Sequence, residues 1–136
     1  MADTISKIEN YTVSLPDRPG EGAKVLAALR EGGADLTAVW GYPLGPGDAR
    51  LELLPKSGSA LRKAAKKAGL TLSGKRTAFL VQGKDKPGVV AAHLAKLGAA
   101  GINVHAVQAV CAGSGRYGAV IFVAPGDLAK AAKALR

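Results

Sequence analysis

The stretch Asp17-Arg18-Pro19-Gly20 decides the fold, because it returns as Asp85-Lys86-Pro87-Gly88, 68 residues further along the chain. The same offset brings further identical residues into register: Leu26 with Leu94, Leu29 with Leu97, Gly33 with Gly101, and Ala38-Val39 with Ala106-Val107. Self-similarity at a fixed period is the signature of a repeated structural unit. The chain therefore contains two copies of one small module.

Each copy predicts the same series of elements. Strands are expected where apolar and polar residues alternate, and a helix is expected where apolar residues form one stripe. The first copy gives strands at 11–15, 36–40, 49–54 and 70–72, and helices around Val25, Leu26 and Leu29 and from Leu61. The second copy gives strands at 78–81, 104–110 and 117–123, and helices around Val90, Leu94 and Leu97 and from Leu128. Ser59 and Asp127 are the expected N-caps of the second helices.

The order strand–helix–strand–strand–helix–strand is the split βαβ, or ferredoxin-like, arrangement. We therefore expect an α+β protein of two tandem ferredoxin-like (βαββαβ) modules, residues 1–73 and 74–136. Each module should have an antiparallel sheet with its helices on one face. The second module lacks its last strand, because the chain reaches Arg136 directly after the second helix.

The missing strand has a consequence for assembly. The segment 76–82 should lie at a sheet edge with unpaired backbone groups, and such edges are usually covered. We expect the two copies to pair internally through their second strands, which leaves this edge free for a second molecule and predicts a homodimer. The alternative is that the residues before Tyr11 fold across the edge.

Composition indicates a globular protein without a membrane segment. Of the 136 residues, 48% are hydrophobic and 21% are charged, and no apolar run is long enough to cross a bilayer. The N-terminal residues carry Asp3, Lys7 and Glu9 and do not resemble a signal peptide. The single Cys111 excludes an intramolecular disulfide and a multi-cysteine metal site. We expect a cytoplasmic protein.

The net charge of +9 raises nucleic-acid binding as the alternative function. Residues 56–76 contain only basic charged side chains, and such a surface attracts anions. RNA-recognition modules share the strand and helix order, but they need aromatic residues on the two central strands. Here those places hold Thr12-Val13-Ser14 and Arg50-Leu51-Glu52. We therefore interpret the charge as a solvated helix face and do not expect a nucleic-acid partner.

The two turns, the Leu-x-x-Leu that follows each, and Ala100-Gly-Ile-Asn-Val104 at the second strand together resemble the ACT domain. Gly33-Ala-Asp-Leu36 is a weaker match to the same motif in the first copy. The resemblance therefore covers nearly the whole chain, once in each copy. ACT domains are regulatory modules that bind small molecules, most often amino acids, at the interface between modules that pair side by side. The resemblance implies a stand-alone tandem protein that binds an amino acid or similar metabolite and regulates an enzyme in trans.

The chemistry of the turns agrees with this. A helix that begins at a glycine offers unpaired N–H groups and the positive end of its dipole to a carboxylate, and glycine allows close approach. Acidic and amide side chains nearby could accept an ammonium group. The expected ligand-binding residues are Asp85, Lys86, Pro87, Gly88, Val89 and Asn103 in the second copy, and Asp17, Arg18, Pro19, Gly20 and Asp35 in the first.

The second copy is the better candidate. In the first, Glu21-Gly22 stands where two apolar residues are usual, and Asp35 stands in place of asparagine. An alternative interpretation is purely structural, in which Asp17 and Asp85 cap the helices and the prolines fix the turns.

We expect no catalytic function. His93 and His105 have no partners at the spacing of a metal site or a catalytic triad. The sequence assembles no nucleophile with a base, no carboxylate pair and no metal cluster. The expectation is a protein that is not an enzyme and carries no cofactor or metal.

Overall fold

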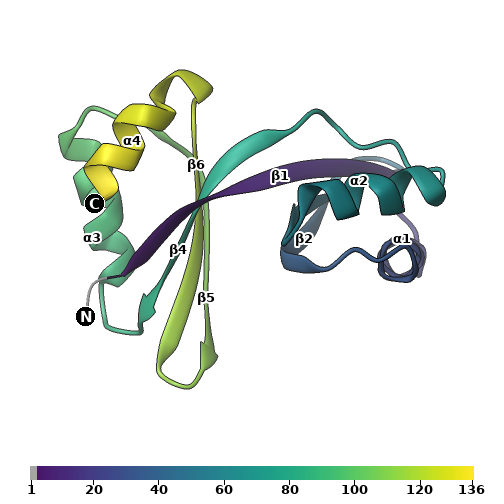
Figure 1. Ribbon diagram of the computed structural model, residues 1–136, viewed down its shortest axis with the longest axis horizontal. Coiled ribbons are helices and arrows are strands. Elements are labelled where there is room, and N and C mark those ends of the chain that lie inside the picture. The colour runs from purple at the N-terminus through teal and green to yellow at the C-terminus, as the bar shows by residue number, and fades with distance from the viewer. Residues whose placement is uncertain (1–2) are drawn as a thin grey trace. The chain divides into compact units, whose positions relative to one another are not determined.

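A computed structural model describes residues 3–136 of the chain. The strands are β1 (Thr4–Pro16), β2 (Leu36–Gly45), β3 (Asp48–Pro55), β4 (Arg76–Lys84), β5 (Val104–Gly113) and β6 (Arg116–Val123). The helices are α1 (Glu21–Glu31), α2 (Gly58–Lys67), α3 (Val89–Ala99) and α4 (Leu128–Leu135), with a short 3-10 helix at Pro125–Asp127 (Figure 1). The sheet order is β2-β3-β1-β4-β6-β5. Within residues 3–136, no helix has the length and apolar character that a membrane crossing requires.

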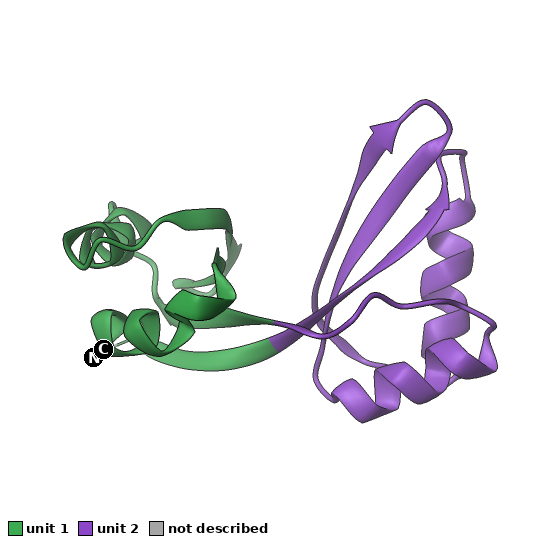
Figure 2. Ribbon diagram, turned by 90° about the horizontal axis from the view of Figure 1, so that it is seen from above, with its two compact units in different colours: residues 1–8, 77–136 green, residues 9–76 purple. Residues whose placement is uncertain are grey.

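The chain divides into two compact units, coloured separately in Figure 2. The first-copy unit is Glu9–Arg76, and the second-copy unit is Thr77–Arg136 together with the residues up to Ile8. The division differs from the expected modules 1–73 and 74–136 mainly at the N-terminus. There, the residues up to Ile8 group with the second copy instead of the first.

The first-copy unit buries one face of its three strands under α1 and α2. Strands β1 and β2 both pair antiparallel with β3, and Tyr11 lies opposite Leu53. The core contains Tyr11, Val13, Val25, Leu29, Leu51, Leu53, Leu61, Ala64 and Ala65. The expected fourth strand at 70–72 forms only an isolated bridge between Leu72 and Val13.

The second-copy unit is completed by the start of β1. Strands β4 and β5 pair antiparallel with β6, and the sheet order places β1 next to β4. Ile5 packs against the core of this unit, which is built from Phe79, Val81, Leu97, Ile102, Tyr117, Ala119, Ile121, Val123, Ala131 and Leu135. The expectation of an open edge at 76–82 is therefore wrong, and its alternative, a cover by the residues before Tyr11, is confirmed.

The reason is the length of β1. It runs from Thr4 to Pro16, whereas the sequence pattern predicted a strand only from Tyr11. Its pairing with β3 begins at Tyr11, so the residues before it are available to the second-copy unit. The expected internal pairing of the two second strands is also wrong, because β2 and β5 are the outermost strands of the sheet.

Helix α2 begins two residues earlier than predicted. The Ser57 hydroxyl accepts a hydrogen bond from the Ala60 backbone N–H at 3.2 Å, so Ser57 is the N-cap. The expected cap, Ser59, lies inside the helix. Asp127 does stand at the N-cap of α4, but its side chain makes no capping hydrogen bond.

Candidate ligand sites

The turn after the first strand has the same backbone geometry in both copies. The Asp17 N–H donates to the Gly47 carbonyl at 3.1 Å, and the Asp85 N–H donates to the Gly115 carbonyl at 2.8 Å. Each turn is thereby fixed to the hairpin between the second and third strands. Gly20 and Gly88 have φ angles of +88° and +77°, a conformation that favours glycine.

Helices α1 and α3 begin directly after these glycines, and neither N-terminus has a side-chain capping bond. The interpretation of Asp17 and Asp85 as helix caps is therefore wrong. The first N–H group of each helix is nevertheless paired within the turn, because Glu21 N–H donates to the Arg18 carbonyl at 3.3 Å and Val89 N–H donates to the Lys86 carbonyl at 3.2 Å. The unpaired N–H groups that the sequence analysis expected for a carboxylate therefore do not include these two, and the positive end of the helix dipole remains.

A cavity of about 260 Å³ adjoins the second turn. It is lined by Asp85, Lys86, Gly88, Val89, Val90, Ala91, Ala109, Val110, Cys111 and Tyr117. Four of the predicted site residues, Asp85, Lys86, Gly88 and Val89, therefore share one cavity. Asp85 raises the pKa of the Cys111 thiol through a hydrogen bond, which disfavours the nucleophilic thiolate.

A cavity of about 290 Å³ adjoins the first turn. It is lined by Leu15, Pro16, Asp17, Arg18, Gly22, Gly41, Tyr42, Pro43, Ala49, Arg50 and Leu51. Two predicted site residues, Asp17 and Arg18, are among them. The sequence analysis ranked this turn second, yet the structure gives it a cavity of similar size.

The two cavities occupy equivalent places in the repeat. At the offset of 68, the shared lining positions are Asp17 and Asp85, Arg18 and Lys86, Gly22 and Val90, Gly41 and Ala109, Tyr42 and Val110, Pro43 and Cys111, and Ala49 and Tyr117. Each cavity thus lies between the turn, the outer strand and the start of the third strand. The outer-strand residues were missed by the sequence analysis, because nothing in their local pattern marks them as binding residues.

Other predicted site residues lie elsewhere. Asn103 is exposed and does not line the cavity. It precedes the start of β5, whereas Ala109–Cys111 lie near its other end, about 20 Å away for an extended strand. Asp35 forms an exposed ion pair with Lys56 at 3.1 Å. Pro19, Gly20 and Pro87 do not line the cavities and contribute to the turns alone.

The wall of the second-copy cavity is tied to the N-terminus. Tyr117, on β6, donates a hydrogen bond to Asp3 Oδ2, and His93 Nε2, on α3, lies 2.7 Å from the same oxygen. Tyr117 OH and His93 Nε2 are 3.1 Å apart. The hydrogen bonds from Tyr117 and His93 lower the pKa of Asp3. Burial, and then the bond to Asp3, raises the pKa of Tyr117.

Sequence reasoning missed this cluster because Asp3 and His93 are separated by 90 positions. One signal was present: His93 takes the place of Val25 on the apolar stripe of the repeat. The His93 side chain is 8% exposed. A carboxylate only accepts hydrogen bonds, so Nε2 carries the proton in this contact. The buried Nδ1 atom has no hydrogen-bond partner within residues 3–136.

The first-copy cavity has a different polar neighbourhood. Tyr42 donates to Glu52 Oε2 at 2.5 Å, and Asn10 Nδ2 donates to Glu52 Oε1 at 3.2 Å. Asn10 and Glu52 are buried. Burial, and then the hydrogen bond to Glu52, raises the pKa of Tyr42. Glu52 was also missed, although it replaces the apolar Val120 of the other copy.

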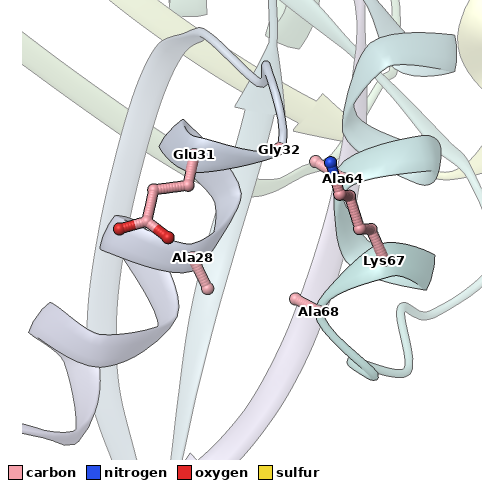
Figure 3. Close-up of a pocket in the computed structure, with 6 residues that line it drawn as sticks. All are labelled: Ala28, Glu31, Gly32, Ala64, Lys67 and Ala68. Atoms are coloured by element: carbon pink, nitrogen blue, oxygen red, sulfur yellow. The ribbon is translucent and has the colours of Figure 1, made fainter.

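A third cavity, of about 370 Å³, lies between α1 and α2 (Figure 3). Ala28, Glu31, Gly32, Ala64, Lys67 and Ala68 line it. The helices meet closely here: a Cβ atom on Gly32 would lie 2.7 Å from the Ala64 Cβ. None of the predicted site residues lines this cavity, and we assign it no ligand.

No family model matches the sequence, and no curated protein matches it. Solved structures do match. Protein BT0572 of Bacteroides thetaiotaomicron is 17% identical, with a TM-score of 0.81 over 96% of this chain and 88% of that chain. The regulatory subunit of aspartate kinase from Thermus thermophilus is 18% identical, with a TM-score of 0.66 over 98% and 93%.

The regulatory subunit of aspartate kinase from Thermus flavus is 21% identical, with a TM-score of 0.59 over 98% of this chain and 93% of that chain. At such identities the likeness shows the fold. The chain therefore has the fold of the regulatory subunits of aspartate kinase, and the ACT-domain resemblance of its sequence is confirmed at the level of the fold.

Proposed function

We propose that the chain is a non-catalytic regulatory protein that binds an amino acid or a similar small metabolite. The observation that carries the proposal is the repeated cavity, which adjoins the same turn and the same strand in both copies. The volumes of about 260 and 290 Å³ lie at or below the range of sites for drug-sized ligands. They suit a ligand of amino-acid size.

The second-copy cavity offers complementary groups to such a ligand. The α3 N-terminus after Gly88 suits a carboxylate through the positive end of its dipole, since no side chain caps it and only its first N–H, that of Val89, is paired with a carbonyl of the turn. Asp85 supplies an acceptor for an ammonium group. Val89, Val90 and Val110 supply an apolar wall for a side chain. In this proposal Lys86 and Pro87 shape the turn.

The outer strands support assembly into a homodimer. Strands β2 and β5 have no strand neighbour on one side, and both carry exposed apolar residues, Val39 and Leu44 on β2 and Val107 and Val110 on β5. Unpaired strand edges favour pairing with another chain. Since the cavities use residues of these strands, a second copy that pairs there would cover the ligand.

Regulation in trans completes the proposal. The Thermus neighbours are named regulatory subunits of aspartate kinase, which is compatible with a chain that conveys ligand binding to a separate enzyme. We place this role in the cytoplasm, where free amino acids are available to a sensor.

A thermal-shift screen of the twenty amino acids tests the proposal, with one variant that fills the cavity. Ala109→Phe puts a large ring on the cavity wall, and Ala112→Phe puts the same ring on an exposed position of β5 outside it. We expect at least one amino acid to stabilise the wild type and the Ala112→Phe protein, and to lose its effect on Ala109→Phe. An equal ligand-induced shift in both variants contradicts the assignment of that ligand to the second-copy cavity.

A further inference from the structure

Three of the differences between the two cavities bear on ligand selectivity. Where the second copy has the ring of Tyr117, the first has Ala49, and where the second has Val110, the first has Tyr42. The third difference is a charge. Arg50 lines the first-copy cavity, and its equivalent in the repeat is Gly118.

This exchange changes the charge of the lining. The charged residues of the second-copy cavity are Asp85 and Lys86, which sum to zero. Those of the first-copy cavity are Asp17, Arg18 and Arg50, which sum to +1. The first cavity is thus the more favourable of the two for an anion.

Arg50 has no carboxylate partner of its own. No ion pair of Arg50 or Arg18 occurs among residues 3–136. The Arg50 Nε atom is shielded from solvent and donates to no acceptor in that part of the chain. The Arg50 side chain does interact with Tyr42, and this interaction lowers the pKa of that phenol. The nearby carboxylate of Glu52 already accepts from Tyr42 and Asn10. A guanidinium in this state is suited to a planar anion, since it binds carboxylates through paired donors.

We propose that the first-copy cavity binds an amino acid with an acidic side chain, whose second carboxylate is held by Arg50, with Arg18 as a second cation in the lining. The second-copy cavity, with Gly118 in place of Arg50 and a lining charge of zero, takes a neutral ligand. The inference rests on the proposed function and adds ligand selectivity to it. The missing ring at Ala49 provides the space that Tyr117 fills in the other copy.

The experiment compares L-glutamate and L-aspartate with their matched amides, L-glutamine and L-asparagine, by calorimetry and by backbone NMR at moderate salt. We expect the acids to bind at least tenfold more tightly than the amides and to shift the amide signals of Gly41 and Tyr42. Arg50→Gln should remove this preference, and Arg50→Lys should keep part of it. Arg30→Gln makes the same charge change on exposed α1 and should leave the preference intact.

A gain of selectivity provides the reciprocal test. A Cβ at Gly118 would contact no atom within 4 Å, so the backbone leaves room for the first atom of the side chain in Gly118→Arg. We expect this variant to show acid-dependent shifts at Ala109 and Val110.

Equal binding of acids and amides at the first-copy cavity, followed by the signals of Gly41 and Tyr42, overturns the inference, as does a preference there that survives in Arg50→Gln. Ligands that perturb only Ala109–Cys111 leave the proposed function standing and refute this inference alone. If none of the twenty amino acids binds either cavity, the proposed function fails as well.

Discussion

The Asp3 carboxylate lies 2.7 Å from His93 Nε2 and joins the start of the chain to helix α3, 90 positions later. Tyr117 donates to the same carboxylate oxygen. These contacts fix the N-terminal residues in the unit that the second copy forms. The contacts with Asp3 also include Tyr117, and this residue lines the second-copy cavity. The second copy is therefore complete only with residues from the other end of the chain.

Asp3→Asn should destabilise the protein. The substitution removes the negative charge that accepts from His93 and Tyr117, and hydrogen bonds to charged groups are worth about 1–3 kcal/mol. We expect a loss of about 1–2 kcal/mol in the free energy of unfolding at neutral pH, measured by urea denaturation.

The loss should depend on pH. The pKa of Asp3 is lowered in the folded state, so its contribution to stability is present above the unfolded value of about 4 and disappears as the pH falls through the folded value. The difference between wild type and Asp3→Asn should therefore shrink in acid. If the difference in the free energy of unfolding stays constant from neutral pH into acid, the contacts of Asp3 with His93 and Tyr117 are contradicted.

All three tyrosines should resist ionisation. Burial is the first cause of the raised pKa of Tyr11, Tyr42 and Tyr117. Because the folded state favours the neutral phenol, these groups stabilise the protein below about pH 10, and the contribution is lost as the pH rises further. A near-ultraviolet titration should show less tyrosinate at pH 10 than the urea-unfolded chain shows.

In the same titration, Asp3→Asn should lower the pKa of Tyr117. After burial, the hydrogen bond to the Asp3 carboxylate is the second cause of the raised pKa of this tyrosine. The curves for the other two tyrosines should not move. Identical titrations for wild type and variant would show that Asp3 and Tyr117 are not in contact in solution.

The first residues of β1 should be hydrogen-bonded to β4 in solution. Since β1 lies next to β4, the amides of residues 4–8 that are directed toward β4 should exchange slowly with solvent, even in protein that light scattering shows to be monomeric. Removal of residues 1–8 should expose β4 and promote association. Fast exchange of the amides of residues 4–8 in the monomer would instead support the prediction from the sequence that the segment 76–82 is an unpaired edge.

Gly88→Ala and Gly98→Ala form a matched pair on α3. A Cβ at either position meets no atom within 4 Å, but only Gly88 has a positive φ, of +77°. We expect Gly88→Ala to cost about 1–2 kcal/mol, since the left-handed conformation is strained for an L-residue. Gly98→Ala should stabilise by up to about 1 kcal/mol, because alanine favours the helix. Equal effects on the free energy of unfolding would refute the turn geometry.

The sequence predicted the features that local chemistry determines. The repeated Asp-x-Pro-Gly turn and the apolar stripes of α1 and α3 follow from neighbouring residues. It could not predict which unit takes the first half of β1, because that strand is continuous and its partners are far away in sequence. The buried polar residues His93 and Glu52 were missed for the same reason.

The candidate site was predicted in part. Asp85, Lys86, Gly88 and Val89 meet in one cavity because they are neighbours on one turn. Asn103 lies apart from this cavity, because proximity to the start of a strand says nothing about which end of that strand adjoins the turn. The residues of β5 that face the cavity became recognisable only through the register of β5 with β6.

The most direct test of the proposed ligand sites is backbone NMR mapping with an amino acid that stabilises the wild type. We expect the shifted amides to cluster at 85–91 and 109–111, at the equivalent residues 17–22 and 41–43, or at both. A cluster around Asn103, or in the cavity between α1 and α2, would contradict the assignment of the ligand sites.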